Sequence, residues 1–192
     1  MLITVEGLDG AGKTTLIESL AQHLNAIVLR EPGGVELSER IRELVQDPSL
    51  EIDPRAEALL YAAARAQLVA TKLRPLLESN ATVILDRFTD SSLAYQGGGR
   101  RLGVDNIRAL NEFGTQGLAP DVTLLLRIDP AQGLARIAGR EADRLEASGL
   151  AFFERVAATY DELAKQPRFK VIDASQPPER VLQDALRAVQ SA

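Results

Sequence analysis

The sequence contains no cysteine, and His23 is its only histidine. Without cysteine, the chain has no disulfide, no catalytic thiol and no zinc site built on thiolates. One histidine cannot supply the cluster of imidazole ligands that a histidine metal centre uses. Thiol enzymes and proteins built around such metal centres are therefore excluded.

Long apolar runs are also missing, since no stretch approaches the roughly 18 residues that a membrane span needs. The chain enters a predicted strand directly after Met1, without the pattern of a signal peptide. We therefore expect a cytoplasmic protein that does not use a membrane. The net charge of −5 argues against a general surface for polymeric nucleic acid.

A glycine-rich stretch stands near the N-terminus: Gly7-Leu8-Asp9-Gly10-Ala11-Gly12-Lys13-Thr14. The order of glycine, four residues and Gly-Lys-Thr is the P-loop pattern. The apolar residues 2–5 before it predict a buried strand, and residues 15–24 have the apolar spacing of a helix. Strand, loop and helix are the context that the motif needs.

The residue types of this loop suit the binding of a nucleotide phosphate. Gly7, Gly10 and Gly12 allow a tight turn in which backbone N–H groups converge on a triphosphate. Lys13 would reach the outer phosphates, and the Thr14 hydroxyl would ligate Mg²⁺. The alternative is a glycine-rich turn that binds nothing, but the flanking elements favour the P-loop.

Short apolar runs alternate with helical patterns along the rest of the chain. Further strands are predicted at 26–29, 81–85, 122–128 and 169–172. Helices are predicted at 15–24, 37–45, 53–77, 89–96, 104–118, 131–138, 150–165 and 178–189. A bend is expected before Pro75, and Gly97-Gly98-Gly99 is expected to end the helix at 89–96.

This alternation predicts an α/β fold whose five-stranded parallel sheet is covered by helices on both faces. No repeat or linker interrupts the chain, so residues 1–192 are expected to form a single domain. Ligands of such sheets bind beyond the carboxyl ends of the strands. The P-loop, Arg30-Glu31, Asp86-Arg87 and Ala174-Ser175 all follow predicted strands, and we expect them to converge at one edge.

Two further pairs of residues suggest binding chemistry. Tyr61 and Arg65 are one helical turn apart, so a flat ring and a forked donor share one face and can bind a base. The alternative is a core tyrosine beside a surface arginine. Asp86 and Arg87 end a buried strand, and a carboxylate there suits a hard cation. The alternative for this second pair is a structural ion pair.

Taken together, the motifs closely resemble the thymidylate kinase family over nearly the whole chain. They are the P-loop, Arg30-Glu31-Pro32-Gly33-Gly34, Tyr61 with Arg65, and Asp86-Arg87-Phe88 followed by Ser91-Ser92-Leu93-Ala94-Tyr95-Gln96-Gly97. The resemblance implies transfer of the γ-phosphoryl group of ATP to dTMP, giving dTDP for dTTP synthesis. It also implies Mg²⁺ as cofactor, a P-loop kinase fold and a homodimer.

The resemblance assigns residues to the nucleoside part of dTMP. It implies that Tyr61 stacks on thymine and that Arg65 reaches its O4, although phenylalanine is commoner at the position of Tyr61. Tyr95 would pack under the deoxyribose and disfavour a 2′-hydroxyl. Ser92 and Gln96 are further candidates for contacts with the base or sugar.

Other implied residues surround the phosphates and the metal. Arg87 would bind the dTMP phosphate, and Asp9 would lie near the acceptor sugar and phosphate. Glu31 is placed in the dTMP site, where it would order metal-bound water, and Asp86 would hold the Mg²⁺ shell together with Thr14. The implied ATP site combines the P-loop with three later residues: Gly7, Leu8, Asp9, Gly10, Ala11, Gly12, Lys13, Thr14, Thr15, Arg136, Ala174 and Ser175.

Thymidylate kinases carry a phosphate-binding arginine either in the P-loop or in a mobile lid. Gly10 occupies the P-loop place, so the resemblance implies a lid around residues 139–149 that supplies arginine. Arg136, Arg140 and Arg144 are spaced by four, which would bring them near one face of a helix. Arg140 and Arg144 are expected to join Lys13, Asp9 and Arg87 in catalysis, whereas Arg136 would flank the adenine. The alternative is a solvated helix with surface ion pairs.

The expected mechanism needs no general base, because a phosphate monoester with a second pKa near ~6 is largely dianionic at pH 7. The obstacle is repulsion among phosphates, which positive charge and alignment overcome. One alternative function is phosphorylation of AMP, CMP or UMP. Another is a nucleotide-dependent switch, although the sequence has no Asn-Lys-X-Asp guanine signature.

Overall fold

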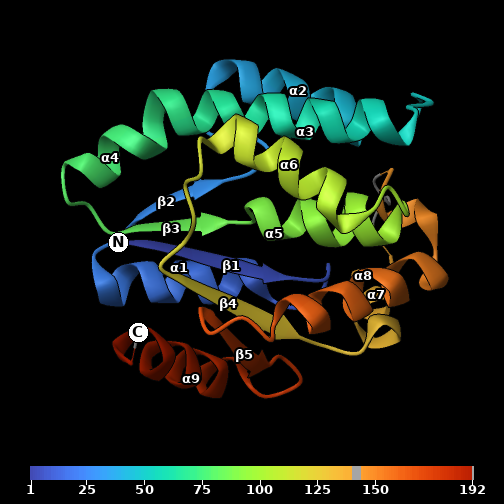
Figure 1. The fold of residues 1–192 in the computed structure, drawn as a ribbon. Helices are drawn as coiled ribbons and strands as arrows, with labels where there is room; N and C mark the ends of the chain where they lie inside the picture. The colour runs from blue at the N-terminus through green and yellow to red at the C-terminus, as the bar shows by residue number, and fades with distance from the viewer. Residues whose placement is uncertain (140–143, 192) are drawn as a thin grey trace.

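A five-stranded parallel sheet forms the centre of the protein, with the strand order β2-β3-β1-β4-β5 (Figure 1). The strands are β1 (Leu2–Gly7), β2 (Ile27–Arg30), β3 (Val83–Asp86), β4 (Val122–Arg127) and β5 (Phe169–Asp173). The computed structural model describes residues 1–139 and 144–191. All five predicted strands are present, so the predicted parallel sheet is confirmed.

Helices cover both faces of this sheet. They are α1 (Lys13–Leu24), α2 (Glu36–Gln46), α3 (Pro54–Leu68), α4 (Arg74–Glu78), α5 (Thr89–Ser92), α6 (Val104–Thr115), α7 (Pro130–Ile137), α8 (Leu150–Leu163) and α9 (Pro178–Gln190). In Figure 1, α1 and α9 lie below the sheet, whereas α2, α3 and α6 lie above it. The central strand β1 is buried along its whole length, which explains its continuous apolar run. No helix in the described ranges combines the length and the apolar character that a membrane crossing requires.

The pairing register brings polar residues to one edge of the sheet. Asp86, at the end of β3, lies opposite Val5 of β1 and opposite Arg30 of β2. The chain runs from β1 to β2 and β3 on one side, and then to β4 and β5 on the other. The end of β1, where Gly7 begins the P-loop, is therefore the switch point at which α/β sheets bind ligands.

The glycine triplet does not end its helix, so that expectation was wrong. After α5, the chain continues as a π-helical stretch, η2, from Leu93 to Gly99. A Cβ atom at Gly98 would lie 1.9 Å from Thr159 Oγ1, and one at Gly99 would lie 2.6 Å from the Phe152 ring. The glycines therefore serve close packing of η2 against α8, and they do not interrupt the helix.

The long helix predicted at 53–77 is present as one uninterrupted helical segment from Pro54 to Glu78. Asp53 caps α3 by accepting a bond from the Arg55 N–H at 2.9 Å, as its position before Pro54 predicted. A π-helical stretch, η1 (Val69–Leu73), then joins α3 to α4. This wider turn ends at Leu73, two residues before Pro75, which has no N–H to donate to a helical hydrogen bond.

Candidate active site

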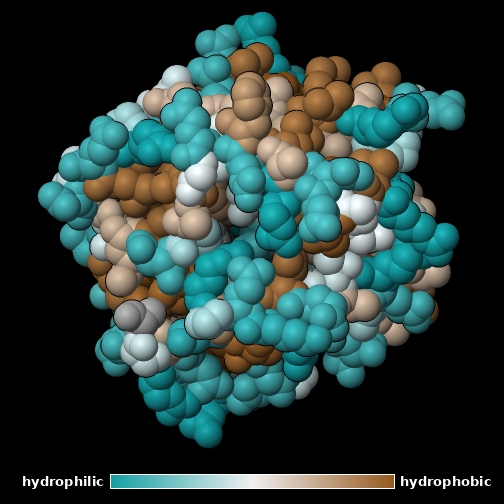
Figure 2. All heavy atoms as spheres, viewed as in Figure 1, coloured by the Kyte–Doolittle hydropathy of each residue, from teal (hydrophilic) through white to brown (hydrophobic). Residues whose placement is uncertain are grey.

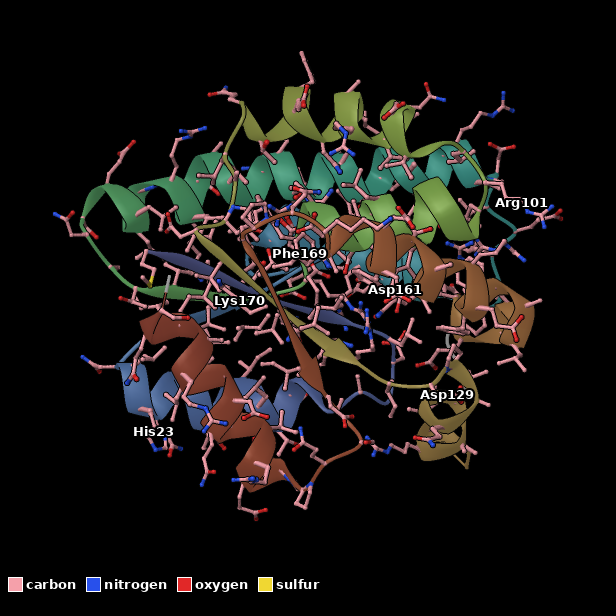
Figure 3. All side chains as sticks on the ribbon, turned by 60° about the horizontal axis from the view of Figure 1, so that its bottom comes forward. His23, Arg101, Asp129, Asp161, Phe169 and Lys170 are labelled. Atoms are coloured by element: carbon pink, nitrogen blue, oxygen red, sulfur yellow. The ribbon has the colours of Figure 1, made fainter. Side chains whose placement is uncertain are left out.

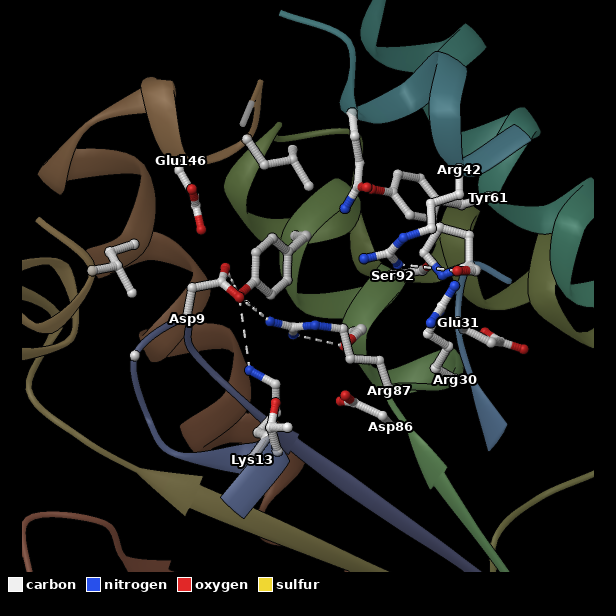
Figure 4. Close-up of a pocket in the computed structure, with 18 of the residues that line it drawn as sticks. Asp9, Lys13, Arg30, Glu31, Arg42, Tyr61, Asp86, Arg87, Ser92 and Glu146 are labelled. Atoms are coloured by element: carbon white, nitrogen blue, oxygen red, sulfur yellow. Dashed lines mark hydrogen bonds and ion pairs between the residues drawn. The ribbon is translucent and has the colours of Figure 1, made fainter. Parts of the chain in front are cut away.

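A cavity of about 560 Å³ opens at the carboxyl ends of the strands (Figure 4). It brings together most of the residues predicted for the site: Asp9, Gly10, Gly12, Lys13, Thr14, Thr15, Glu31, Tyr61, Arg65, Asp86, Arg87, Ser92, Tyr95, Gln96 and Arg136. Among the described residues, six basic and four acidic side chains line it, on a chain of net charge −5. A local excess of positive charge favours an anionic ligand.

Some predicted residues lie outside this lining. Gly7 and Leu8 face a neighbouring cavity of about 590 Å³, which Ser175 also lines. The Ser175 N–H and hydroxyl both donate to Asp173. Ala174 meets the site indirectly, because its carbonyl accepts a bond from Arg136 at 3.1 Å. The buried Ala11 contributes to the turn of the P-loop, where its N–H donates to the Leu8 carbonyl.

The P-loop holds Lys13 at the base of the cavity. Gly10 and Gly12 have φ angles of +80° and +89°, which glycine adopts without strain, and α1 begins at Lys13. The Lys13 ammonium donates to the carbonyls of Gly7 at 3.2 Å and Leu8 at 2.9 Å. Burial, with the nearby charge of Arg87, lowers the pKa of Lys13 to about 8. Lys13 is therefore a buried cation that is held by two neutral carbonyl oxygens and pairs with the Asp9 carboxylate at 3.7 Å.

Arg87 reaches across the cavity toward Asp9 (Figure 4). Its guanidinium donates to Asp9 Oδ1 at 2.5 Å and to the Gly7 carbonyl at 3.0 Å, while the Tyr95 hydroxyl donates to Asp9 Oδ2 at 3.1 Å. Burial alone would raise the pKa of Asp9, but Arg87 and Lys13 outweigh it and lower that pKa to about 2. Arg87 has a φ of +66°, a left-handed conformation that is uncommon outside glycine and that gathers at functional sites.

The close packing around Gly10 excludes an arginine at this position of the P-loop. A Cβ atom at this position would lie 2.2 Å from the carbonyl oxygen of Gly133 in α7. Arg136, one turn further along α7, donates to the Gly10 carbonyl at 3.3 Å and to that of Ala174. The loop and α7 are thus packed backbone to backbone, and no side chain fits between them.

Tyr61 and Arg65 both line the cavity, as their shared helical face predicted. Arg65 is 2% exposed, which contradicts the alternative of a surface arginine. It donates to Glu31 Oε2 at 2.7 Å, to Asn111 Oδ1 at 2.6 Å and to the Phe88 carbonyl at 3.1 Å. Three of its five N–H donors are used in these bonds. Burial raises the pKa of Glu31 to about 6, although Arg65 opposes this shift.

Tyr95 and Gln96 come from η2, the stretch that the glycine triplet allows to pack closely. The Tyr95 ring meets those of Phe152, Phe153 and Tyr160 edge-on, with centroids 6.1 to 6.4 Å apart. Gln96 is buried and donates to Glu57 at 2.8 Å. These contacts hold both side chains rigidly in the wall of the cavity.

The donor set fits a hard metal ion. Asp86 Oδ1 is buried and has no hydrogen-bond partner among the described residues, and Thr14 is exposed in the same cavity. In the described part of the chain, no three His, Cys, Asp or Glu side chains group as a complete metal site. This arrangement suits Mg²⁺, which takes one or two carboxylates and completes its shell with water and substrate phosphates.

The predicted helical face of three arginines is wrong. Helix α7 ends at Ile137, because Ala138 is extended and Gly139 has a φ of +101°. Arg140 lies outside the described residues. Arg144 is not part of the cavity lining and instead donates to Glu57 Oε2 at 2.5 Å.

Sequence reasoning missed Glu6, a fully buried carboxylate just before the P-loop. It accepts bonds from the Phe88 N–H at 2.8 Å, the Ser91 hydroxyl at 2.5 Å and the Tyr160 hydroxyl at 2.8 Å. Burial, together with the charge of Asp90, raises the pKa of Glu6 to about 7. A charged residue inside an apolar strand was the signal that could have revealed it.

Arg42, Glu57 and Glu146 were also missed. Arg42 lines the cavity from α2 and donates to the Pro32 carbonyl at 3.1 Å. Glu146 lines the cavity directly, whereas Glu57 lies behind the lining with no exposed surface. Helical positions of this kind look like solvated charges in a sequence, so the pattern held no clear signal for them.

Comparison with known proteins agrees with this geometry. The family model described as thymidylate kinase matches residues 5–185. A thymidylate kinase of Oenococcus oeni is 47% identical over 202 residues, covering 99% of this chain and 95% of its own length. A thymidylate kinase of Deinococcus radiodurans is 47% identical over 197 residues, covering 98% of this chain and 96% of its own length. The chain belongs to the thymidylate kinase family.

A solved structure supports the same family. The crystal structure of thymidylate kinase from Ehrlichia chaffeensis is 30% identical, with a TM-score of 0.82, and covers 99% of this chain and 98% of its own. The P-loop kinase fold expected from the sequence is thereby confirmed. As a member of the thymidylate kinase family, the chain is a nucleoside monophosphate kinase, and its cavity is the candidate active site.

Proposed function

We propose that the chain transfers the γ-phosphoryl group of ATP to dTMP, giving dTDP. One observation carries this proposal: the P-loop and the Tyr61–Arg65 pair line the same cavity, with Arg87 between them in the lining. A phosphate-binding loop and a base-binding face therefore open into one space. That is the requirement for direct transfer between two nucleotides.

The acceptor nucleoside is proposed to lie against α3 and η2. The Tyr61 ring would stack on thymine, and the two N–H donors for which Arg65 has no hydrogen-bond partner within residues 1–139 and 144–191 would serve the base edge. Tyr95, held by three aromatic rings, would pack under the deoxyribose. Ser92 and Gln96 complete this part of the lining.

We propose that phosphate oxygens replace the present hydrogen-bond acceptors of Lys13 and Arg87. Both cations now hydrogen-bond to backbone carbonyls, and both pair with Asp9. Phosphate oxygens carry more charge than a carbonyl and are better acceptors for these donors. Arg87 would bind the dTMP phosphate, Lys13 would bind the γ-phosphate of ATP, and Asp9 would remain beside the acceptor.

Mg²⁺ is the proposed cofactor, with Asp86 and Thr14 as the residues that would hold it. When bound, it would neutralise charge on the phosphates of the donor. No side chain has to remove a proton, because the dTMP phosphate has a second pKa of about 6 and is dianionic at neutral pH. The chain contributes position and positive charge.

An ADP-release assay over a panel of nucleoside monophosphates tests this proposal. We expect turnover with dTMP and little with AMP, CMP or UMP, because the Tyr61–Arg65 face is built for one base. A preference for another monophosphate would change the substrate. Slow ATP hydrolysis that ignores every monophosphate would instead indicate a nucleotide-dependent switch.

Substitution of Tyr61 separates the acceptor site from the donor site. A stacked base contributes about 1–3 kcal/mol, by analogy with nucleic-acid binding. Tyr61→Ala is therefore expected to weaken dTMP binding and to leave ATP binding unchanged in calorimetric titrations. Tyr61→Phe keeps the ring and is the matched control. Equal weakening of both nucleotides by Tyr61→Ala would show that this helix is structural.

A homodimer is the proposed assembly, through the layer of α2, α3 and α6. This layer carries large apolar side chains in contact with solvent: Phe113 at 87% exposure, Leu59 at 58%, Leu37 at 49% and Leu44 at 48%. Figure 2 shows apolar atoms gathered along the same upper side of the molecule. Exposed apolar patches of this kind mark protein interfaces.

The dimer is tested by placing one charge on this layer. Phe113→Glu is expected to give a folded monomer, because the interface would have to bury an unpaired carboxylate. Leu150→Glu, at the first position of α8, is the control and should leave the mass unchanged. Sedimentation velocity measures both variants. A wild-type monomer, or a dimer that survives Phe113→Glu, would exclude this interface.

Two further assignments stay proposals. The cytoplasm is the proposed location, because ATP and deoxynucleotides are found there. Residues 1–192 are proposed to be one kinase domain whose lid lies around 139–149.

A further inference from the structure

Glu57 lies in the first turn of α3 and is fully buried behind the cavity lining. Three side chains from other parts of the chain donate to its carboxylate. Gln96 Nε2 donates to Oε1 at 2.8 Å, and Arg144 and Arg100 donate to Oε2 at 2.5 Å and 3.1 Å. One carboxylate thus joins η2, the turn that follows it and the segment 144–149 that precedes α8.

Two partners of Glu57 form or adjoin one wall of the cavity. Gln96 lines the cavity itself, and Arg144 directly precedes Leu145 and Glu146, which also line it. The Arg144 Nε donates to the Val45 carbonyl at 3.0 Å, at the end of α2. Arg144 therefore fixes the beginning of this wall to α2 and α3 together.

Arg100 strengthens the same junction. It donates to Ser148 Oγ at 3.1 Å and lies 5.0 Å from the centroid of the Phe152 ring. Its neighbour Arg101 is exposed and points away from the molecule (Figure 3). The basic pair at 100–101 is therefore divided, and only Arg100 serves the interior.

The charge of Glu57 is what keeps these groups together. The Arg144 and Arg100 side chains are 12% and 20% exposed, so both guanidinium groups have lost most of their water. A buried ion pair that loses one partner leaves an uncompensated charge, which is strongly destabilising. Without the carboxylate, the two guanidinium groups would repel each other and would be more stable in contact with solvent. The cavity wall that contains Gln96, Leu145 and Glu146 would then shift with them.

We propose that Glu57 is a positioning residue for the acceptor nucleotide. It touches no substrate, and it acts through Gln96 and Arg144 on the wall that faces dTMP. This inference rests on the proposed function. It assigns Arg144 to the support of the wall and not to the transferring phosphate.

Steady-state kinetics of Glu57→Gln tests the proposal. The change keeps the shape of the side chain and removes its charge. The KM for dTMP is expected to rise about tenfold or more, because small misplacements of binding groups are costly. The KM for ATP should stay within about twofold, because the P-loop and Arg136 do not contact Glu57. An unchanged KM for dTMP, or an equal rise in both constants, would overturn the proposal.

Asp121→Asn is the matched control. It is also a carboxylate-to-amide change, and Asp121 accepts a bond from the Leu2 N–H at 2.6 Å at the opposite edge of the sheet. It should lower the melting temperature without changing either KM. A rise in the KM for dTMP in this variant would show that any loss of stability has the same effect, which would also overturn the proposal.

A double-mutant cycle with Arg144→Gln tests whether Glu57 acts on the cavity wall through Arg144. This single variant should reproduce the selective rise in the KM for dTMP, and the double variant should lose less than the sum of the two. Arg144→Gln also carries the test if Glu57→Gln fails to fold. A fall in kcat at constant KM would place Arg144 on the transferring phosphate and overturn the proposal. A wild-type protein without dTMP-dependent ADP release would refute the proposed function itself. If the wild type is active and the variants keep its KM for dTMP, only the role of Glu57 is refuted.

Discussion

Lys13→Met is expected to lower kcat by about 10²–10³ while the protein remains folded, since removal of one donor that stabilises transition-state charge typically costs that much. Lys13 is the cation that the P-loop itself supplies, and its ammonium is held in place by two backbone carbonyls. Methionine preserves the length of the side chain and fills the same buried space. The loss should therefore fall on phosphoryl transfer and not on packing.

Turnover at saturating ATP and dTMP measures this effect, with circular dichroism as the check on folding. Lys165→Met is the control, because Lys165 is 70% exposed and pairs with Glu162 at the surface. It should retain wild-type turnover. A folded Lys13→Met protein with kcat within a few-fold of wild type would refute the P-loop assignment.

Arg87→Lys is expected to reduce kcat/KM for dTMP by at least about 100-fold, because hydrogen bonds to charged groups contribute about 1.5–3 kcal/mol each. The variant keeps the positive charge and the same demand for a left-handed backbone. It loses the planar fork that reaches Asp9 and the Gly7 carbonyl together. The loss would therefore report the geometry of phosphate recognition and not the charge alone.

Arg168→Lys is the matched control for this substitution. Arg168 also holds a carboxylate with its fork, donating to the two Asp90 oxygens at 2.6 and 2.8 Å, and it is not part of the cavity lining. The control should lower stability and leave kcat/KM unchanged. If Arg87→Lys retains wild-type efficiency with dTMP, the acceptor phosphate lies elsewhere.

Local spacing predicted the parts of the site that depend on local geometry. The P-loop was recognisable because its glycines, lysine and threonine act within one turn. Tyr61 and Arg65 share a face because a helix has 3.6 residues per turn, and both line the cavity. Asp86 and Arg87 were placed correctly because every strand of a parallel sheet ends at the same edge.

Long-range packing decided what spacing could not predict. The Glu57 carboxylate is joined to Gln96 and Arg144, which are 39 and 87 residues away, so no local pattern reveals the cluster. Arg136, Arg140 and Arg144 have helical spacing, yet the left-handed Gly139 follows the end of α7. The glycines at 97–99 resemble a helix end, whereas the nearness of α8 requires them inside a helix.

The carboxyl group of Glu6, buried under the P-loop, links folding to proton uptake. Its pKa rises from 4.5 to about 7 on folding, so between these values the folded chain holds a proton that the unfolded chain releases. Its contribution to stability is complete below about pH 4.5 and is lost as the pH rises through 7. The dTMP phosphate becomes dianionic over nearly the same interval, with a pKa of about 6. Over most of the pH range in which the proposed acceptor becomes dianionic, Glu6 of the folded protein therefore keeps its proton, and it releases that proton only as the pH rises through 7.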